Sequence, residues 1–211
     1  QAARDEHMVE LACISVGIAG GRLESTMGIG ESSLEERIAE PLAELLDAGL
    51  EVGYCARMGE VDVRLIAYGD GARELIERGE VIVQQRVGDF IYGRDDDQLE
   101  EVIVCELTKR GLTLVVAESC TGGFLAHRIT NISGASAVFL AGHCTYSNKA
   151  KQSTLGVKPE TLAAQGAVSD PVAREMAEGA RAKHGADFAL ATTGIAGPTG
   201  GTDGKPVGTV F

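Results

Sequence analysis

The spacing of apolar and polar positions changes near residue 95, and the first part of the chain predicts a small α+β domain over residues 1–95. A helical repeat of leucine and isoleucine precedes two stretches that are typical of strands joined by a short turn at Met58-Gly59. The predicted elements are a strand at 8–18, a helix at 32–47, strands at 51–57 and 60–69, and a helix at 70–87.

Three local features refine this prediction. Pro41 lies inside the helical repeat, and because proline has no amide donor we expect it to kink or split the helix. In the second strand of the hairpin, Val61 and Val63 alternate with Asp62 and Arg64, so we expect one buried and one exposed face. The glycine-rich stretch GIAG at 17–20 is interpreted as a turn.

Beyond the charged stretch at 93–97, strands alternate with helices. This order predicts a layered α/β/α domain with a mostly parallel sheet over residues 96–211. We expect Gly111 to end the first helix, and Ser169 to cap the helix that contains Pro171 near its start. The predicted elements are helices at 99–110, 122–131 and 170–184, strands at 112–117, 137–146 and 187–193, a glycine-rich loop at 194–206 and the start of a strand at 206–211.

The formal net charge of −12 is divided unevenly between the two parts. Residues 1–95 hold 9 Lys and Arg against 19 Asp and Glu, whereas residues 96–211 hold 10 against 12. Nucleic-acid backbones are held by clustered Lys and Arg, so we expect no nucleic-acid partner. The nearly neutral second part can still accept a small anion.

Cysteine and histidine usage favours a cytoplasmic protein without a metal site. The five cysteines are odd in number and widely spaced, with no CxxC pair, and the four histidines lack metal-ligand spacing. No apolar run is long enough to cross a bilayer, so we expect no membrane partner. The chain begins at Gln1 without a methionine, which we interpret as a fragment boundary.

The stretch AESCTGG at 117–123 follows an apolar strand and opens a helix. Ligands of open α/β sheets sit at the carboxyl ends of strands, and a helix start offers amide donors to an anion. Ser119 is therefore a candidate nucleophile, and the turn that follows it is a candidate anion site. A plain turn without a ligand is the alternative. Cys120 is the competing nucleophile, but we interpret it as a packed small residue.

The stretch TYSNKAK at 145–151 also follows a strand. Lys151 can accept a serine proton if burial lowers the pKa of its amine, and Tyr146 can relay a proton or hold an oxyanion. The alternative is an exposed helix that carries Lys149 and Lys151 on its surface.

The loop between 192 and 209 is rich in glycine, which is costly to order without a purpose. Thr193 and the amide of Gly194 are candidates to bind a phosphate or an oxyanion, and Lys205 to reach a phosphate from a mobile lid. The spacing does not fit a Walker A loop, because Pro206 stands where Ser or Thr is required. A flexible surface loop is the alternative.

Taken together, these stretches resemble the carboxy-terminal domain of CinA-type proteins, which also exists alone as nicotinamide-nucleotide amidase. Residues 28–38 and 52–67 resemble the KH-like linker domain of the same family. The stretches that carry the first resemblance are, in order, AESCTGG (117–123), GAS (134–136), TYSNKAK (145–151), LGV (155–157), GAVS (166–169), TTGIAGPTGG (192–201) and KPVGTV (205–210).

The resemblance implies an amidohydrolase that converts nicotinamide mononucleotide to nicotinate mononucleotide and ammonia, without metal or cofactor. By motif position Ser119 is the nucleophile and Tyr146 and Lys151 are the activating pair, while Ser136 and Thr193 are hydrogen-bonding or proton-relay groups. We also expect a homo-oligomer. The expected substrate-binding residues are Thr121, Gly122, Gly123, Asn148, Gly194, Gly197 and Lys205.

Two departures from the family pattern qualify these expectations. The family's carboxy-terminal domain continues with a further strand and helix past residue 211, so we expect a truncated sheet. The amino-terminal CinA domain linked to ADP-ribose hydrolysis has no counterpart here. The alternative function is a non-catalytic pyridine-nucleotide-binding or regulatory module, and the acidic first part argues against a nucleic-acid role.

Overall fold

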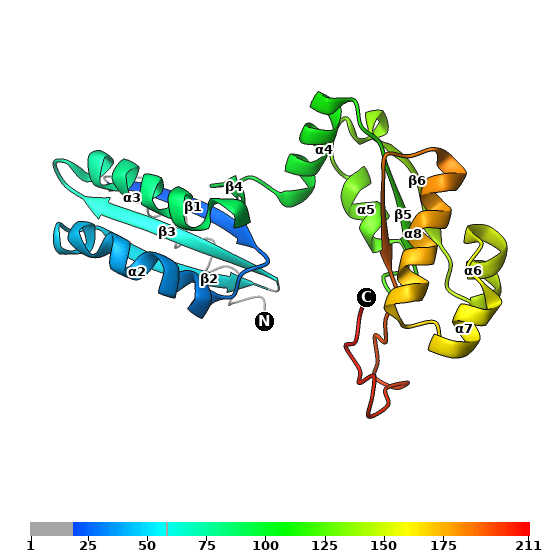
Figure 1. Ribbon diagram of the computed structural model, residues 1–211. Helices are drawn as coiled ribbons and strands as arrows, with labels where there is room; N and C mark the ends of the chain where they lie inside the picture. The colour runs from blue at the N-terminus through cyan, green and yellow to red at the C-terminus, as the bar shows by residue number, and fades with distance from the viewer. Residues whose placement is uncertain (1–18, 58) are drawn as a thin grey trace, which may run out of the picture. The chain divides into compact units, whose positions relative to one another are not determined.

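The computed structural model describes residues 19–57 and 59–211, and the chain divides into two compact units between Leu99 and Glu100 (Figure 1). The predicted strand at 8–18 and Met58 of the predicted turn lie outside the described residues. The amino-terminal unit contains β1 (Ala19–Met27), α2 (Glu31–Asp47), β2 (Glu51–Arg57), β3 (Glu60–Tyr68), α3 (Ala72–Val87), the 3₁₀ turn η2 (Gly88–Phe90) and β4 (Ile91–Arg94).

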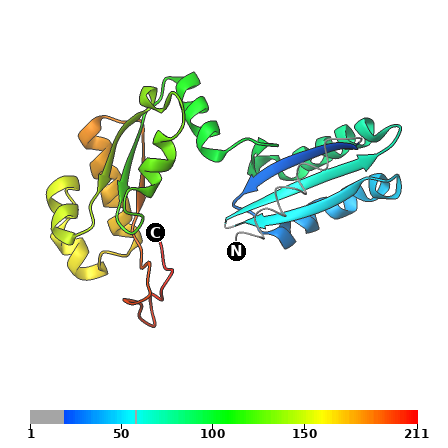
Figure 2. The ribbon, with the colours of Figure 1, turned by 180° about the vertical axis from the view of Figure 1, so that it is seen from behind.

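The amino-terminal unit is a four-stranded antiparallel sheet, in the order β2-β3-β1-β4, with α2 and α3 on one face (Figures 1 and 2). Val63 and Leu65 of β3 pack beneath the buried residues of α2, such as Leu34 and Ile38. The predicted hairpin is confirmed, because Arg57 pairs with Glu60 and the two strands run antiparallel. The strand β4 has no counterpart among the predicted elements.

Three details of the prediction for this unit are wrong. The helix α2 is not split at Pro41, since its buried residues remain packed on the sheet on both sides of the proline. Asp62 is buried rather than exposed, and its carboxylate pairs with Arg57 on the neighbouring strand. Ala19 and Gly20, interpreted as part of a turn, begin β1.

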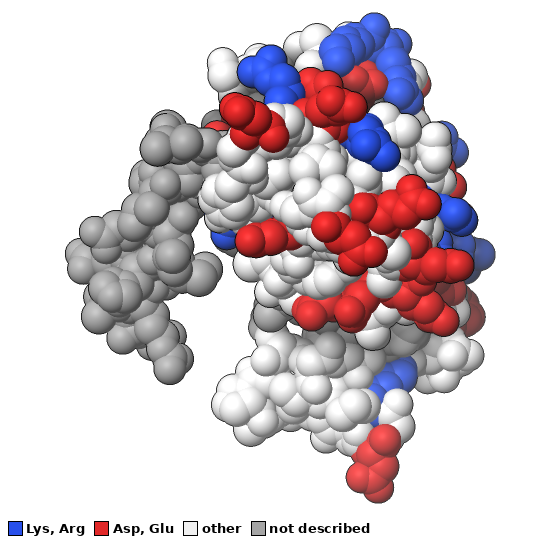
Figure 3. All heavy atoms as spheres, turned by 90° about the vertical axis from the view of Figure 1, so that its left-hand side faces the viewer, with Lys and Arg blue, Asp and Glu red and all other residues white. Residues whose placement is uncertain are grey.

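The outer surface of α2 is acidic. All six of its Asp and Glu side chains are exposed, and Figure 3 shows acidic side chains gathered on the face in view. Like charges repel a phosphate backbone, so the surface of this helix gives no support for nucleic-acid binding. The absence of a nucleic-acid partner stays a prediction.

The carboxy-terminal unit is a three-stranded parallel sheet, in the order β6-β5-β7, covered by helices on both faces (Figures 1 and 2). This arrangement confirms the predicted α/β layering. Its elements are α4 (Leu99–Arg110), β5 (Leu114–Glu118), α5 (Phe124–Thr130), the 3₁₀ turn η3 (Ala135–Ala137), β6 (Phe139–Cys144), α6 (Asn148–Leu155), α7 (Pro159–Gln165), α8 (Asp170–His184) and β7 (Phe188–Thr192).

Alternate side chains of the central strand β5 face opposite layers. Val115 and Ala117 pack with apolar residues of α6, α7 and α8, whereas Leu114 and Val116 pack with those of α4 and α5. All five residues of β5 are buried, as expected for the middle of a parallel sheet. The carboxyl end of β5 therefore lies at the edge of the sheet where ligands of such folds bind.

The predicted ends of the elements in this unit are confirmed only in part. Gly111 ends α4 with a φ of 63°, as predicted for a glycine cap. Ser169 does occupy the cap position of α8, but its hydroxyl donates to the carbonyl of Gly166 instead of accepting a helix amide. Residues 206–211 form no full strand, although Val210 bridges to Gly194. The short helix α7 has no counterpart among the predicted elements, and α6 corresponds only to the alternative helix that carries Lys149 and Lys151.

Candidate active site

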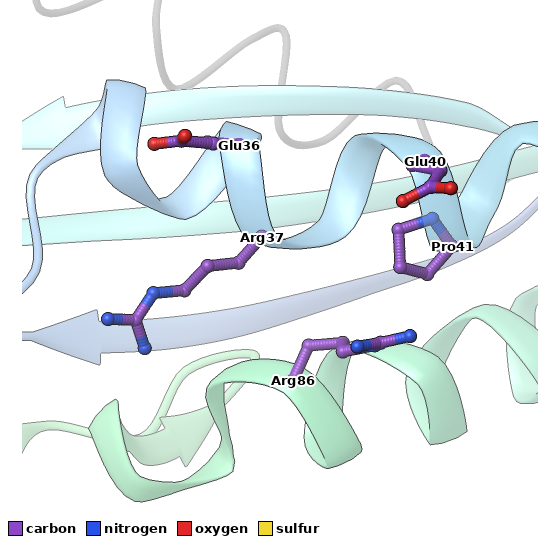
Figure 4. A pocket seen from close by; sticks show the side chains of 5 residues that line it. All are labelled: Glu36, Arg37, Glu40, Pro41 and Arg86. Atoms are coloured by element: carbon purple, nitrogen blue, oxygen red, sulfur yellow. The ribbon is translucent and has the colours of Figure 1, made fainter.

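One hollow of the amino-terminal unit lies between α2 and α3. Figure 4 shows its lining, which comes from the two facing helices. The guanidinium of Arg37 also lies 5.1 Å from the centre of the Phe90 ring. This lining offers charged groups but no nucleophile. The residues that line the hollow are Glu36, Arg37, Glu40, Pro41 and Arg86.

Three buried hydroxyl residues form a row at the carboxyl ends of the parallel strands. Ser119, Thr145 and Thr193 each directly follow β5, β6 and β7, and their exposed fractions are 8%, 2% and 1%. The register makes them neighbours, because the last residue of β5 pairs with the last residue of each flanking strand. In a parallel sheet such positions share one edge, so the three residues lie side by side there.

Lys151 reaches this row from α6. Its Nζ lies 2.8 Å from the Oγ of Ser119, 2.7 Å from the carbonyl oxygen of Thr145 and 3.4 Å from that of Tyr146. Only 1% of the lysine is exposed. The interpretation of Lys151 as a surface residue is therefore wrong, and the sequence-predicted meeting of Ser119 with Lys151 is present in the structure.

The local sequence explains why α6 places the lysine here. The hydroxyl of Ser147 caps the helix by accepting the amide of Ala150, and Gly156 ends it with a φ of 72°. Lys151 and Leu155 are four residues apart, so both side chains lie on the face of α6 that is buried. Leu155 anchors this face in the core, and the anchor holds the amine of Lys151 over the strand ends.

The surroundings of Lys151 favour its neutral form. Burial lowers the pKa of the amine, and the thiols of Cys120 and Cys144 oppose this shift only in part. Within the described residues no carboxylate forms an ion pair with Lys151. A lysine in such surroundings is the kind that acts as a general base.

The contacts of Lys151 can be satisfied in both of its protonation states. A neutral amine has two N–H donors and one lone pair, which match the two carbonyl oxygens and the hydroxyl proton of Ser119. A charged ammonium has three donors, which match the same two carbonyls and the serine oxygen. The proton can therefore pass from Ser119 to Lys151 without rearrangement of the surrounding backbone.

Tyr146 does not take the position predicted for it. Its side chain is 75% exposed, and only its backbone carbonyl contacts Lys151. The side chain of Thr145, by contrast, is buried, and its Oγ1 has no hydrogen-bond partner among the described residues. The sequence analysis missed Thr145, although its position directly after a strand is the signal that identified Ser119.

Ser136 also lies away from Ser119. It belongs to η3, which precedes the amino end of β6, whereas Ser119 follows the carboxyl end of β5. The two strands are parallel, so their amino and carboxyl ends lie at opposite edges of the sheet. Within one chain, therefore, the expectation that Ser136 lies in the same site is wrong.

The turn after Ser119 is held by Glu118, the residue before it. The amides of Gly123 and Leu125 donate to its Oε2 at 3.0 Å, and the amide of Ala126 donates to its Oε1 at 2.8 Å. The Gly122 amide donates to the carbonyl of Ser119. The amides of Gly122 and Gly123, predicted to hold a phosphate, are thus already engaged.

The hydroxyl of Thr121 lies with Glu118 on the α5 side of the sheet, whereas Lys151 lies on the α6 side. It is 2.7 Å from the hydroxyl of Thr192 and also hydrogen-bonds Glu118. Asn148, another predicted binding residue, is exposed at the first position of α6. Both residues flank the strand ends, but neither contacts the pair of Ser119 and Lys151 through a hydrogen bond in the described part of the chain.

The glycine-rich loop projects beyond the strand ends, and Lys205 ties it to the connection between α7 and α8 (Figure 1). Thr193 donates its hydroxyl to the carbonyl of Ala167 at 2.8 Å. Lys205 donates to the carbonyls of Gln165 and Val168 at 2.8 and 2.6 Å. Lys205 is therefore tied to the connection between α7 and α8, and it does not reach for a phosphate as predicted.

Gly194 and Gly197, both predicted to bind substrate, stand where a side chain would not fit. A Cβ at Gly194 would lie 3.0 Å from the Sγ of Cys120, which brings the loop backbone next to the residue after Ser119. A Cβ at Gly197 would lie 2.5 Å from a methyl group of Val207, which closes the loop on itself. Of these two glycines, only Gly194 lies beside the turn that follows Ser119.

The described residues hold neither a cluster of metal ligands nor a membrane-spanning helix. No group of three or more His, Cys, Asp or Glu side chains in residues 19–57 and 59–211 is placed to hold a metal ion. Over the same residues, no helix combines the length and the apolar character needed to cross a membrane.

Comparison with known proteins places the chain among relatives of one kind. A putative competence-damage inducible protein of Moorella thermoacetica is 49% identical over 193 residues, which are 90% of this chain and 46% of the relative. A CinA-like protein of Akkermansia muciniphila is 47% identical over 190 residues, 90% of this chain and 44% of the relative. The chain thus spans less than half the length of these relatives.

Solved structures agree with the sequence relatives. The crystal structure of the competence/damage inducible protein CihA from Agrobacterium tumefaciens is 50% identical, with a TM-score of 0.52, and covers 53% of this chain and 67% of that one. A CinA superfamily protein from Escherichia coli is 40% identical, with a TM-score of 0.51, over 53% and 64% of the two chains.

The matches to protein families cover both units. Residues 22–93 match the damage-inducible protein CinA KH domain, and residues 96–211 match the CinA C-terminal domain. On the strength of the second match, which covers more than half of the sequence, the chain belongs to the CinA family.

Proposed function

We propose that the carboxy-terminal unit hydrolyses the amide of nicotinamide mononucleotide to nicotinate mononucleotide and ammonia. The observation that carries the proposal is the buried contact of 2.8 Å between Ser119 Oγ and Lys151 Nζ, in surroundings that lower the pKa of the lysine. The substrate class rests on the resemblance to the amidase of this family.

In the first half of the reaction, Lys151 takes the proton of Ser119 while Oγ attacks the carboxamide carbon. The tetrahedral intermediate collapses to a serine ester. The carboxamide nitrogen of the substrate leaves as ammonia with the proton that Lys151 returns. In the second half, Lys151 takes a proton from water while the water oxygen attacks the ester carbon. The intermediate expels Oγ of Ser119, which receives that proton back from Lys151, and the acid product loses a proton to solvent and leaves as the carboxylate. No metal is needed, because the lysine activates both nucleophiles.

The oxyanion of the intermediate needs hydrogen-bond donors. The Gly122 amide is engaged by the carbonyl of Ser119, so the amide of Gly194, beside Cys120, is the better candidate. One well-placed donor of this kind contributes ~3–4 kcal/mol to the transition state.

Ammonia release from nicotinamide mononucleotide tests the proposal. We expect Ser119→Ala and Lys151→Met to lower kcat on the order of 10³-fold or more, while substrate binding largely survives. Lys149→Ala on the same helix is the matched control, since Lys149 is exposed and should leave kcat unchanged. Cys120→Ala should also retain activity, because Cys120 is not the nucleophile in this mechanism.

Two outcomes would contradict the proposal in different ways. Binding of the mononucleotide without ammonia release would favour the non-catalytic alternative. Ammonia release that survives Ser119→Ala but not Cys120→Ala would move the nucleophile to the thiol.

A further inference from the structure

Glu118 is a buried carboxylate that sits at the start of α5, next to the nucleophile in sequence. It ends β5, and its side chain points to the layer of α5, whereas the neighbouring Ser119 meets Lys151 on the layer of α6. Both carboxylate oxygens accept backbone amides of the first turn of α5, at 2.8 to 3.0 Å. Glu118 therefore fills the site that a helix start offers to an anion.

Hydrogen bonds hold the carboxylate there as an anion, and no basic side chain among the described residues pairs with it. Burial alone would raise the pKa of Glu118, but hydrogen bonds from the Thr121 hydroxyl and from the amides of Ala126, Leu125 and Gly123 outweigh it and lower the pKa below its usual value. The amides and the helix dipole thus replace the ion pair that a buried charge would otherwise need.

These contacts fix the short turn that carries the nucleophile. The turn is tied to β7 by the amide of Ser119, which donates to the carbonyl of Thr192 at 2.9 Å, and to α5 by Glu118. A rotation of the backbone at residue 118 would move Glu118 and the Oγ of Ser119 in opposite directions, since adjacent strand residues face opposite sides. Any loosening of the carboxylate would therefore displace Oγ from the amine of Lys151.

We propose that Glu118 is a positioning residue, whose carboxylate locks the turn after β5 so that Ser119 Oγ stays within hydrogen-bonding distance of Lys151 Nζ. This inference rests on the proposed function for its kinetic consequences. A displacement of about 1 Å at a reacting atom can lower the rate about 10²-fold. The substrate does not touch Glu118, so its loss should act on kcat and leave KM nearly unchanged.

The test replaces Glu118 by glutamine and by aspartate in the full chain. Glu118→Gln keeps the size but turns an N–H₂ group towards the helix amides, so we expect kcat to fall about 10²-fold with KM changed less than about threefold. Glu118→Asp keeps the charge and should recover part of kcat. The pH dependence of both variants should keep the wild-type inflection, because the basicity of Lys151 is not altered.

Glu175→Gln is the matched control. Glu175 belongs to α8, and its carboxylate accepts the backbone amide of Lys158 at 2.8 Å and the hydroxyl of Thr161 at 2.7 Å. These partners lie at the start of α7, away from Ser119. We expect this variant to lose stability and keep kcat. Equal retention of kcat in Glu118→Gln and Glu175→Gln would overturn the proposal and leave Glu118 a structural cap.

A second readout separates this proposal from the choice of substrate. The rate at which phenylmethylsulfonyl fluoride sulfonylates Ser119, followed by intact mass, reports the activated serine without nicotinamide mononucleotide. Labelling of the wild type that is slowed by Glu118→Gln would support the positioning role even if no ammonia is released. Equal labelling rates, or none in the wild type, would overturn it.

Discussion

Gly179→Ala should push α6 away from α8 and separate Lys151 from Ser119. A Cβ at Gly179 would lie 1.8 Å from the carbonyl oxygen of Leu155 and 2.8 Å from its carbonyl carbon. Ordinary contact begins at 3.4 Å, so the two backbones would have to move apart by about 1.5 Å. Leu155 is one helical turn beyond Lys151, so the lysine would move with it.

The magnitude follows from two opposed effects. Replacement of a helical glycine by alanine stabilises a helix by ~1 kcal/mol. Overpacking costs ~1–3 kcal/mol, and it lies at the upper end here because the obstructing atoms belong to backbone. We expect a net loss of roughly 2 kcal/mol at the melting temperature, which lowers the Tm of a unit this size by about 10 °C.

Thermal unfolding followed by circular dichroism measures the loss of stability. Ammonia release at a temperature where the variant is folded measures the loss of activity. We expect kcat to fall about 10²-fold as the amine leaves hydrogen-bonding distance. Glu178→Ala is the control, since Glu178 is exposed on the same helix and should leave Tm and kcat nearly unchanged. A Gly179→Ala variant with a raised Tm and normal kcat would refute the described packing of α6 on α8.

Three further predictions test other parts of the molecule. Because burial lowers the pKa of Lys151, kcat/KM should fall with decreasing pH through an inflection below that of a free lysine; a profile with the ordinary lysine value would contradict the proposed base. Burial raises the pKa of Glu24 to about 7, although Arg94 opposes the shift, so its contribution to stability is full below the ordinary carboxyl value and is lost as the pH rises through about 7. Denaturant unfolding between pH 4 and 8 should show this decline, and Glu24→Gln should flatten it; an equally steep decline in the variant would refute the assignment. Lys205→Met removes two hydrogen bonds to residues 165 and 168, so hydrogen exchange of residues 165–169 should increase while the amino-terminal unit stays unchanged; equal protection in both proteins would show that Lys205 does not hold this segment.

Much of the fold could be predicted because it follows from local periodicity. The helical repeat fixed α2, and the alternation of Val61 and Val63 fixed the buried face of β3. The apolar stretch of β5 indicated a central strand, and the order of strands and helices then indicated parallel layers. These predictions succeed because burial of an amphipathic face dominates the stability of such elements.

The candidate site could be predicted only in part, because the side chains that complete it depend on contacts between distant segments. The position of Ser119 after a strand indicated a reactive residue, but nothing local distinguishes the buried Thr145 from the exposed Tyr146 beside it. Alternation along β6 and the turn into α6 decide which of the two side chains is buried. Likewise, only the sheet register shows that Ser136 lies at the opposite edge from Ser119.

The sequence by itself determined the two-part organisation, the α/β layering and the residue types that can perform the chemistry. Only the tertiary structure decided that Lys151 is buried against Ser119 and that Glu118 occupies the helix start expected to bind a phosphate. The physical reason is that periodicity and propensity act between neighbours along the chain. The pKa of a lysine and the partners of a carboxylate depend instead on the segments that fold around them.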